Sequence, residues 1–134
     1  MNGERVLDAS ALLALAYAEA GNDRVQRAIV RGALISVVNW AEGLSSMAER
    51  GEQVDNVARR LRSLIDGIGT LRVMPFAEND AEAAARLRLA TRHLSLSLAD
   101  RACLALGRLY RLPVLTTDRA WRSLHISVRI EVIR

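Results

Sequence analysis

Short apolar runs and longer periodic segments alternate along the whole chain. Nearly continuous apolar runs are typical of strands buried on both faces, and they occupy residues 6–7, 33–38, 71–76 and 114–117. Between them, apolar residues recur every three or four positions, which predicts helices. These helices cover residues 11–20, 24–31, 40–50, 52–68, 78–93 and 98–110, with a short helical turn at 119–124.

The last segment has a different pattern. Apolar and polar residues alternate strictly over residues 126–132, with Ser127, Arg129 and Glu131 at the polar positions. A period of two predicts a fifth strand with one face in water, which is typical of the edge of a sheet.

This alternation of strands and helices predicts an α/β fold. We expect a mainly parallel five-stranded sheet with right-handed crossovers and helices on both faces. The 134 residues suit a single domain over positions 1–134, and a hydrophobic content of 51% is enough to fill its core.

Several classes of protein are disfavoured by what the sequence lacks. No apolar run approaches the ~18–20 residues of a membrane-spanning helix, and residues 1–5 do not resemble a signal peptide. The single cysteine, Cys103, lies in an apolar helical pattern, so we interpret it as a buried thiol in a reducing compartment and expect a cytoplasmic protein without membrane contact.

The formal net charge is +4, and all 19 basic residues are arginines. Without lysine there is no P-loop and no Schiff-base chemistry. A GC-rich genome accounts most simply for the arginine usage. The functional interpretation is a basic surface for phosphates, which arginine binds with two parallel hydrogen bonds.

Four carboxylates stand where predicted strands end or predicted helices begin: Asp8, Glu42, Asp100 and Asp118. Each has a local structural explanation. Asp8 and Asp118 can cap helices, and segments 39–42 and 97–100 resemble capping boxes, in which a first-turn acid accepts a hydrogen bond from the cap residue. For each carboxylate taken alone, we prefer that explanation.

Together, the four carboxylates point to a metal site. The strands of a parallel sheet end at one edge, where open α/β folds bind their ligands. Carboxylates gathered there raise one another's pKa, and a divalent cation relieves their repulsion. Because all the ligands are oxygens, we expect Mg²⁺ or Mn²⁺, which can activate water for attack on a phosphodiester.

Two hydroxyls accompany these carboxylates in the sequence. Ser10 follows Asp8 by two residues, and Thr117 directly precedes Asp118. Either they support the acids or touch phosphate, or they are an ordinary helix cap and strand end. The two alternatives are about equally favoured.

Over nearly its whole length, the chain resembles PIN-domain proteins, specifically the VapC-type toxins of bacterial toxin–antitoxin systems. The resemblance rests on the order and spacing of segments 6–15, 36–42, 96–106 and 112–121. It implies a Mg²⁺- or Mn²⁺-dependent endoribonuclease acting on structured RNA of the tRNA or rRNA class. It also implies that Asp8, Glu42, Asp100 and Asp118 bind the metal. Some members carry a further acid where this chain has Ala120, which puts a second metal ion in doubt.

The resemblance also implies a homodimer and an inhibiting antitoxin, part of which lies in an apolar groove. Candidate groove residues are Leu12, Tyr17, Trp40, Leu44, Met47, Val54 and Leu61. Of these we expect Tyr17, Trp40 and Met47 to be exposed, because aromatic residues and Met are enriched at interfaces. Leu12 and Leu44 are better explained as core.

Arginines near the acids are candidates for RNA contacts. Arg101 and Arg119 each directly follow one of the four acids, so they could offset its charge or hold a phosphate. Arg86, Arg88 and Arg92 could line a rim that faces RNA, although a solvated helix face is the simpler explanation.

Two alternatives compete with the nuclease. The first is a phosphatase or phosphotransfer domain with Asp8 as nucleophile. The phosphatase would need a second aspartate where Ser10 stands, and a receiver-like phosphotransfer domain would need a lysine, which the chain lacks. A catalytically inactive PIN-fold module that binds RNA or protein is the second alternative. The presence of all four acids argues mildly against it.

Overall fold

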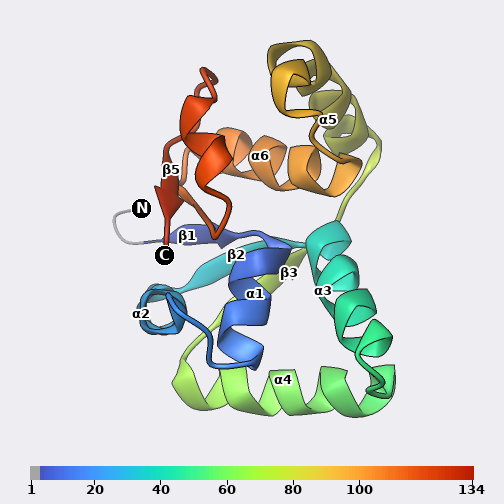
Figure 1. The fold of residues 1–134 in the computed structure, drawn as a ribbon, viewed down its shortest axis with the longest axis vertical. Coiled ribbons are helices and arrows are strands. Elements are labelled where there is room, and N and C mark those ends of the chain that lie inside the picture. Colours follow the sequence, from blue (N-terminus) through green and yellow to red (C-terminus); the bar gives the residue numbers. More distant parts are fainter. Residues whose placement is uncertain (1–3) are drawn as a thin grey trace.

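The computed structural model describes residues 4–134, in which strands and helices alternate as the apolar pattern predicts (Figure 1). The strands are β1 (Arg5–Leu7), β2 (Ala33–Ser36), β3 (Leu71–Met74), β4 (Val114–Thr116) and β5 (Ile130–Val132). The α-helices are α1 (Ala9–Ala16), α2 (Asn22–Arg31), α3 (Val37–Glu49), α4 (Val54–Ile68), α5 (Glu78–Ala90) and α6 (Leu98–Tyr110). Two short 3-10 helices complete the fold, η1 (Arg92–Leu94) and η2 (Arg119–Ser123).

The five strands form one sheet in the order β3-β2-β1-β4-β5, and every pairing between neighbours is parallel. The predicted five-stranded parallel sheet is therefore confirmed, and β5 lies at an edge as expected. Because β1 is central, the residue that follows it emerges at the middle of the carboxyl edge of the sheet.

Helices cover both faces of the sheet and bury a core on each (Figure 1). On one face, α1 and α2 cover the sheet, and α4 packs against α2 and α3, so that all of these helices share one buried cluster with Leu7, Ile35 and Leu115. On the other face, α5 and α6 pack on Val6 and Leu34. Successive strand residues point to opposite faces, so both kinds of position must be apolar, and this explains the continuous apolar runs.

Several elements differ in length from the sequence prediction. Helix α1 ends at Ala16, where Gly21 was expected to end it, because Ala18 adopts a positive φ of 50° and the Glu19 N–H turns back to the Ala14 carbonyl. Alanine rarely adopts this conformation, so the sequence carries no signal for the break. Strand β2 stops at Ser36, two residues early, because Ser36 caps α3.

The predicted strand over 126–132 was too long. Only Ile130–Val132 pair with β4, because β4 has three residues and begins at Val114, directly after Pro113. The Arg129 carbonyl still accepts a hydrogen bond from the Val114 N–H, but the Val128 N–H turns to the nearby Ile126 carbonyl.

Within the part of the chain that the structure describes, no helix is long and apolar enough to cross a membrane.

Candidate active site

Asp8 lies directly after the central strand and caps α1. One of its oxygens, Oδ1, accepts hydrogen bonds from the Ala11 N–H at 2.8 Å and from the Ser10 hydroxyl at 2.6 Å. The other, Oδ2, accepts a hydrogen bond of 2.6 Å from the Thr116 hydroxyl on β4. The side chain is therefore held at both oxygens in one orientation.

Burial dominates the electrostatics of Asp8. The residue is only 5% exposed, and desolvation raises the pKa of its carboxyl group to about 6 against an ordinary 3.8. The three hydrogen bonds favour the ionised form and oppose this rise, while the charge of Asp100 adds to it. Asp8 is thus a buried carboxylate kept from its ordinary pKa by its surroundings, which is typical of functional sites.

Glu42 and Asp100 belong to the same electrostatic group as Asp8. Partial burial raises the pKa of Glu42, and the charges of Asp100 and Asp8 raise it further. The three side chains come from α1's cap, α3 and α6, elements that pack on one another around the carboxyl edge of the sheet. Convergence of these three acids is what the parallel sheet predicts.

The local role of Glu42 differs from the expected one. Helix α3 is capped by Ser36, whose hydroxyl accepts a hydrogen bond from the Val38 N–H, so Glu42 lies beyond the first turn and makes no capping box with Asn39. Asn39 is instead a buried residue in the first turn of α3, and its side-chain amide donates a hydrogen bond of 2.9 Å to the Ala99 carbonyl on α6. The expected box at Ser97 is confirmed, since Asp100 Oδ2 accepts from the Ser97 N–H and Ser97 Oγ accepts from the Asp100 N–H.

Asp118 stands apart from these three. It is exposed and caps η2 by accepting a hydrogen bond of 2.9 Å from the Ala120 N–H. Its link to the group runs through the backbone, because the Asp118 N–H donates to the Thr116 hydroxyl that in turn bonds Asp8.

The hydroxyl that contacts the Asp8 carboxylate from β4 is that of Thr116, not that of the predicted Thr117. Thr117, the candidate, contributes only its backbone N–H, which donates to the Ser10 hydroxyl at 2.9 Å. The pairing of β4 with β1 selects Thr116, which is the last residue of β4 and lies one position beyond the Leu7–Leu115 pair, and the sequence carries no signal for this register.

Among residues 4–134, no three Asp, Glu, His or Cys side chains are arranged to enclose a metal ion by themselves. The donor set nevertheless suits one ion class. Mg²⁺ keeps several waters and usually takes one or two carboxylates together with substrate phosphate, so it does not require an all-protein cage. A buried Asp8 carboxylate, with a Glu42 pKa that the charges of Asp100 and Asp8 raise, fits such a hydrated cation.

A family model described as PIN domain matches residues 5–126. This protein belongs to the PIN-domain family. A search of the curated proteins found no match.

Solved structures share the fold of this PIN domain. DNA-bound VapBC from Salmonella typhimurium has a TM-score of 0.71 at 17% identity, with 96% of each chain covered. VapBC2 from Rickettsia felis, bound to a promoter DNA fragment, gives 0.69 at 12% identity, covering 96% of this chain and 97% of that one. VapC20 from Mycobacterium tuberculosis, described as a sarcin–ricin loop cleaving toxin, gives 0.67 at 16% identity over 93% and 98% of the chains. At these identities the likeness shows the fold alone.

Arg101, a candidate phosphate contact of this PIN domain, is buried. Its guanidinium donates a hydrogen bond of 3.0 Å to the Ala84 carbonyl on α5, and its Nε has no partner among the described residues. Adjacent helix residues point roughly 100° apart, so a neighbour of Asp100 faces a different surface of α6. The expectation that Arg101 could hold phosphate is therefore wrong, and its role is to join α6 to α5.

The other arginine candidates lie at the surface. Arg119 is exposed, and its Nε donates to the Arg134 carbonyl at 3.1 Å. Arg86 forms an exposed ion pair with Glu82, whereas Arg88 and Arg92 line a small cavity of about 130 Å³ beside η1.

Two of the three groove candidates that we expected to be exposed are partly exposed in this PIN domain. Tyr17 and Trp40 are partly exposed, and an arginine guanidinium stacks on each ring, that of Arg50 at 4.1 Å and that of Arg62 at 4.9 Å from the ring centre. Met47 is fully buried in the core under α1 and α4, so the expectation that it is exposed was wrong. A flexible apolar side chain at that position fills the interior.

Cys103 is a free, fully buried thiol, as predicted. Burial raises its pKa well above the ordinary value, and the nearby charges of Asp8, Asp100 and Glu42 act in the same direction. The thiol therefore stays protonated and is no nucleophile.

Proposed function

We propose that this protein is a metal-dependent endoribonuclease that cleaves structured RNA and is inhibited by an antitoxin protein. The observation that carries the proposal is the arrangement of Asp8. This buried carboxylate is held at both oxygens at the carboxyl edge of a parallel sheet. The charge of Asp100 raises its pKa, and its own charge raises the pKa of Glu42.

In this proposal Asp8, Glu42 and Asp100 hold Mg²⁺ or Mn²⁺, and Asp118 supplies a further carboxylate at the rim. When bound, the ion supplies Lewis-acid stabilisation of the phosphate and a water of lowered pKa. Ser10 and Thr116 keep the Asp8 carboxylate in one orientation, so its oxygens need little reordering. The N-termini of α1 and α6, capped by Asp8 and Ser97, lie beside the acids and favour a negatively charged phosphate.

The choice of RNA as substrate rests on family membership and on fold likeness. A fold relative, VapC20, is described as cleaving the sarcin–ricin loop, which is a structured RNA element. The net charge of +4 is compatible with a polyanionic substrate.

An antitoxin is proposed as a partner because several fold relatives are VapBC toxin–antitoxin assemblies. We place its docking surface on α1, α3 and α4, where Tyr17 and Trp40 are partly exposed. Partly exposed aromatic residues are typical anchors for a protein partner. A homodimer is also proposed, and gel filtration with light scattering measures it directly.

Cleavage of total RNA by the antitoxin-free protein tests the nuclease. Reactions with Mg²⁺, with Mn²⁺ and with EDTA are compared for the wild-type chain, Asp8→Asn and the control Asp66→Asn, which changes an exposed carboxylate on α4. We expect discrete metal-dependent cuts from the wild-type and control chains and none from Asp8→Asn.

Cuts that persist in Asp8→Asn, or in EDTA, would overturn the proposed site. RNA binding without cleavage under any of these conditions would favour the inactive binding module instead.

A further inference from the structure

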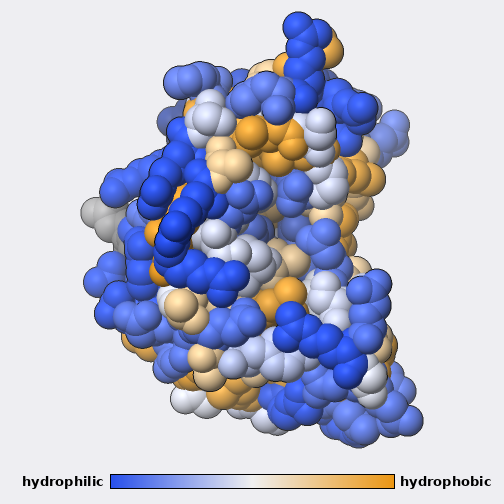
Figure 2. Space-filling model, viewed as in Figure 1, coloured by the Kyte–Doolittle hydropathy of each residue, from blue (hydrophilic) through white to orange (hydrophobic). Residues whose placement is uncertain are grey.

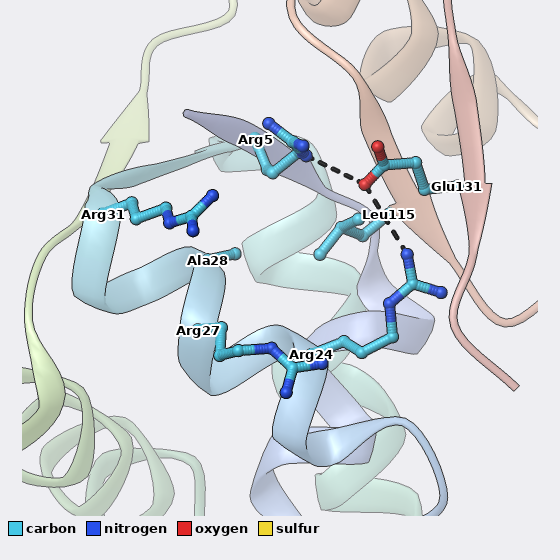
Figure 3. A pocket seen from close by; sticks show the side chains of 7 residues that line it. All are labelled: Arg5, Arg24, Arg27, Ala28, Arg31, Leu115 and Glu131. Atoms are coloured by element: carbon cyan, nitrogen blue, oxygen red, sulfur yellow. Dashed lines mark hydrogen bonds and ion pairs between the residues drawn. The ribbon is translucent and has the colours of Figure 1, made fainter. Parts of the chain in front are cut away.

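A second polar cavity lies away from the acids, between α2 and the sheet face that α2 covers (Figure 3). Its volume is about 210 Å³. Its lining residues are Arg5, Arg24, Arg27, Ala28, Arg31, Leu115 and Glu131. We call it the arginine pocket. In Figure 2 strongly hydrophilic side chains gather on this side of the molecule, over β5 and α2.

The fold itself brings these arginines together. Three of them lie on one face of α2, because positions 24, 27 and 31 are spaced by three and four residues. The fourth, Arg5, comes from β1 on the same sheet face as Leu7, whose neighbour Leu115 pairs in register with Glu131 of β5. The pocket therefore joins one helix to three neighbouring strands.

Positive charge in the pocket exceeds what its one carboxylate can neutralise. Glu131 accepts a hydrogen bond of 2.8 Å from Arg5 Nε and also pairs with Arg24 at 3.8 Å and with Arg129 at 3.6 Å. A single carboxylate thus serves three guanidinium groups.

The two remaining arginines are not needed by that network. Arg27 forms only an exposed ion pair with Asp23 at 3.4 Å, and among residues 4–134 no ion pair involves Arg31. Like charges four residues apart on a helix disfavour it, and the Asp23 carboxylate pairs with Arg27 but not with Arg31.

The chemistry of the pocket fits a phosphate group. Guanidinium groups offer only donors in a planar fork, and they bind phosphate oxygens in pairs. A phosphate has enough oxygens to accept from several arginines at once. The pocket is smaller than the roughly 300–1,000 Å³ of sites for drug-sized ligands, so it suits a single phosphate rather than a whole cofactor.

We propose that the arginine pocket binds a backbone phosphate of the RNA substrate, outside the cleavage site. This inference rests on the proposed ribonuclease function. Arg5 precedes Asp8 by three residues, or roughly 10 Å along an extended strand, and Leu115 directly precedes Thr116, which bonds Asp8. One RNA chain can therefore occupy both places.

The test compares two double variants that each remove two exposed arginines. Arg27→Gln with Arg31→Gln changes the pocket and leaves the contacts of Glu131 with Arg5 and Arg24 intact. Arg59→Gln with Arg108→Gln is the matched control on α4 and α6. Binding of bulk tRNA is measured in EDTA at several salt concentrations, and thermal unfolding by circular dichroism checks that each variant folds.

We expect the pocket variant to bind tRNA about tenfold more weakly than the control, with a salt dependence whose slope is smaller by about one. The arginine Nε–H signals in ¹H–¹⁵N spectra give a second readout. Inorganic phosphate should shift those of Arg5, Arg24, Arg27 and Arg31, and tRNA should shift the same set at far lower concentration.

Three results would overturn the proposal. The first is equal affinity and equal salt slope in the two double variants. The second is phosphate binding in the pocket without any effect of tRNA, which would indicate a free small anion as ligand. The third is a polyglutamate peptide that shifts these signals while tRNA does not, which would indicate an acidic protein segment.

Cleavage by the wild-type chain is scored separately. If it cleaves RNA while both double variants bind alike, only the pocket proposal fails. If tRNA binds through the pocket but is never cut, only the nuclease proposal fails.

Discussion

The side-chain amide of Asn39 donates a hydrogen bond of 2.9 Å to the backbone carbonyl of Ala99. Asn39 is fully buried and lies one turn before Glu42 on α3, whereas Ala99 is adjacent to Asp100 on α6. This contact therefore fixes the distance between two helices that each carry an acid of the site. The other atom of the amide, Oδ1, has no partner among the described residues.

Replacing Asn39 with Ala should loosen both the fold and the site. The change removes the hydrogen bond between the two helices and part of a buried side chain, which should cost about 1–3 kcal/mol of the free energy of unfolding in urea. We expect the cleavage rate to fall as well, because Glu42 and Asp100 lose their fixed separation. Asn56→Ala, at an exposed position on α4, is the control and should leave both quantities close to wild type. Full activity in a destabilised Asn39→Ala chain would limit this residue to a structural role.

The Thr116 hydroxyl sets how easily Asp8 ionises. It donates to the Asp8 carboxylate and so lowers the pKa of that group. Thr116→Val should raise this pKa further and move the acid limb of the cleavage profile to higher pH. Thr117→Val is a matched control, because the structure uses only the backbone N–H of Thr117. An equal shift in both variants, or in neither, would contradict this role.

Burial of Asp8 should make the metal-free protein less stable as pH rises. The pKa of Asp8 is about 6 in the folded chain and near 3.8 in the unfolded chain. At a pH between these two values, the carboxyl group is therefore protonated in a larger fraction of folded molecules than of unfolded ones. Stability is highest below pH 4 as far as this group is concerned. It falls through the window from about pH 4 to 6, by about 3 kcal/mol in total.

Asp8→Asn removes that penalty. In EDTA at pH 7.5 we expect its free energy of unfolding to exceed that of wild type, with the difference shrinking toward pH 4.5. Asp66→Asn, which changes an exposed carboxylate, should show a difference that varies little with pH. A variant less stable than wild type at pH 7.5 would show that the hydrogen bonds of Asp8 outweigh its desolvation.

Metal binding should be visible in stability without any RNA. An ion that binds only the folded chain stabilises it by about 2.7 kcal/mol when present at a hundredfold excess over Kd. Mg²⁺ or Mn²⁺ should therefore raise the melting temperature of the wild-type chain and of Asp66→Asn. The rise should be much smaller in Asp8→Asn. Equal stabilisation of all three proteins would place the ion elsewhere.

The sequence by itself determined the architecture and the general place of the site. Continuous apolar runs separated by helical periodicity require strands covered on both faces, and short connections through helices require those strands to be parallel. Acids that follow such strands are then expected at one edge of the sheet. Asp8 directly follows the central strand, and the charge of Asp8 acts on Glu42, whereas Asp118, which follows β4, lies apart from them.

Only the tertiary structure decided which side chains face one another across that edge. Ser36 rather than Asn39 caps α3, so Asn39 lies within the helix and its side chain contacts α6. The register of β4 against β1 selects Thr116 over Thr117, and the cap of α6 at Ser97 sets the direction of Arg101 toward α5. One residue of shift moves a strand side chain to the opposite face and a helix side chain by roughly 100°, so sequence spacing alone could not determine these contacts.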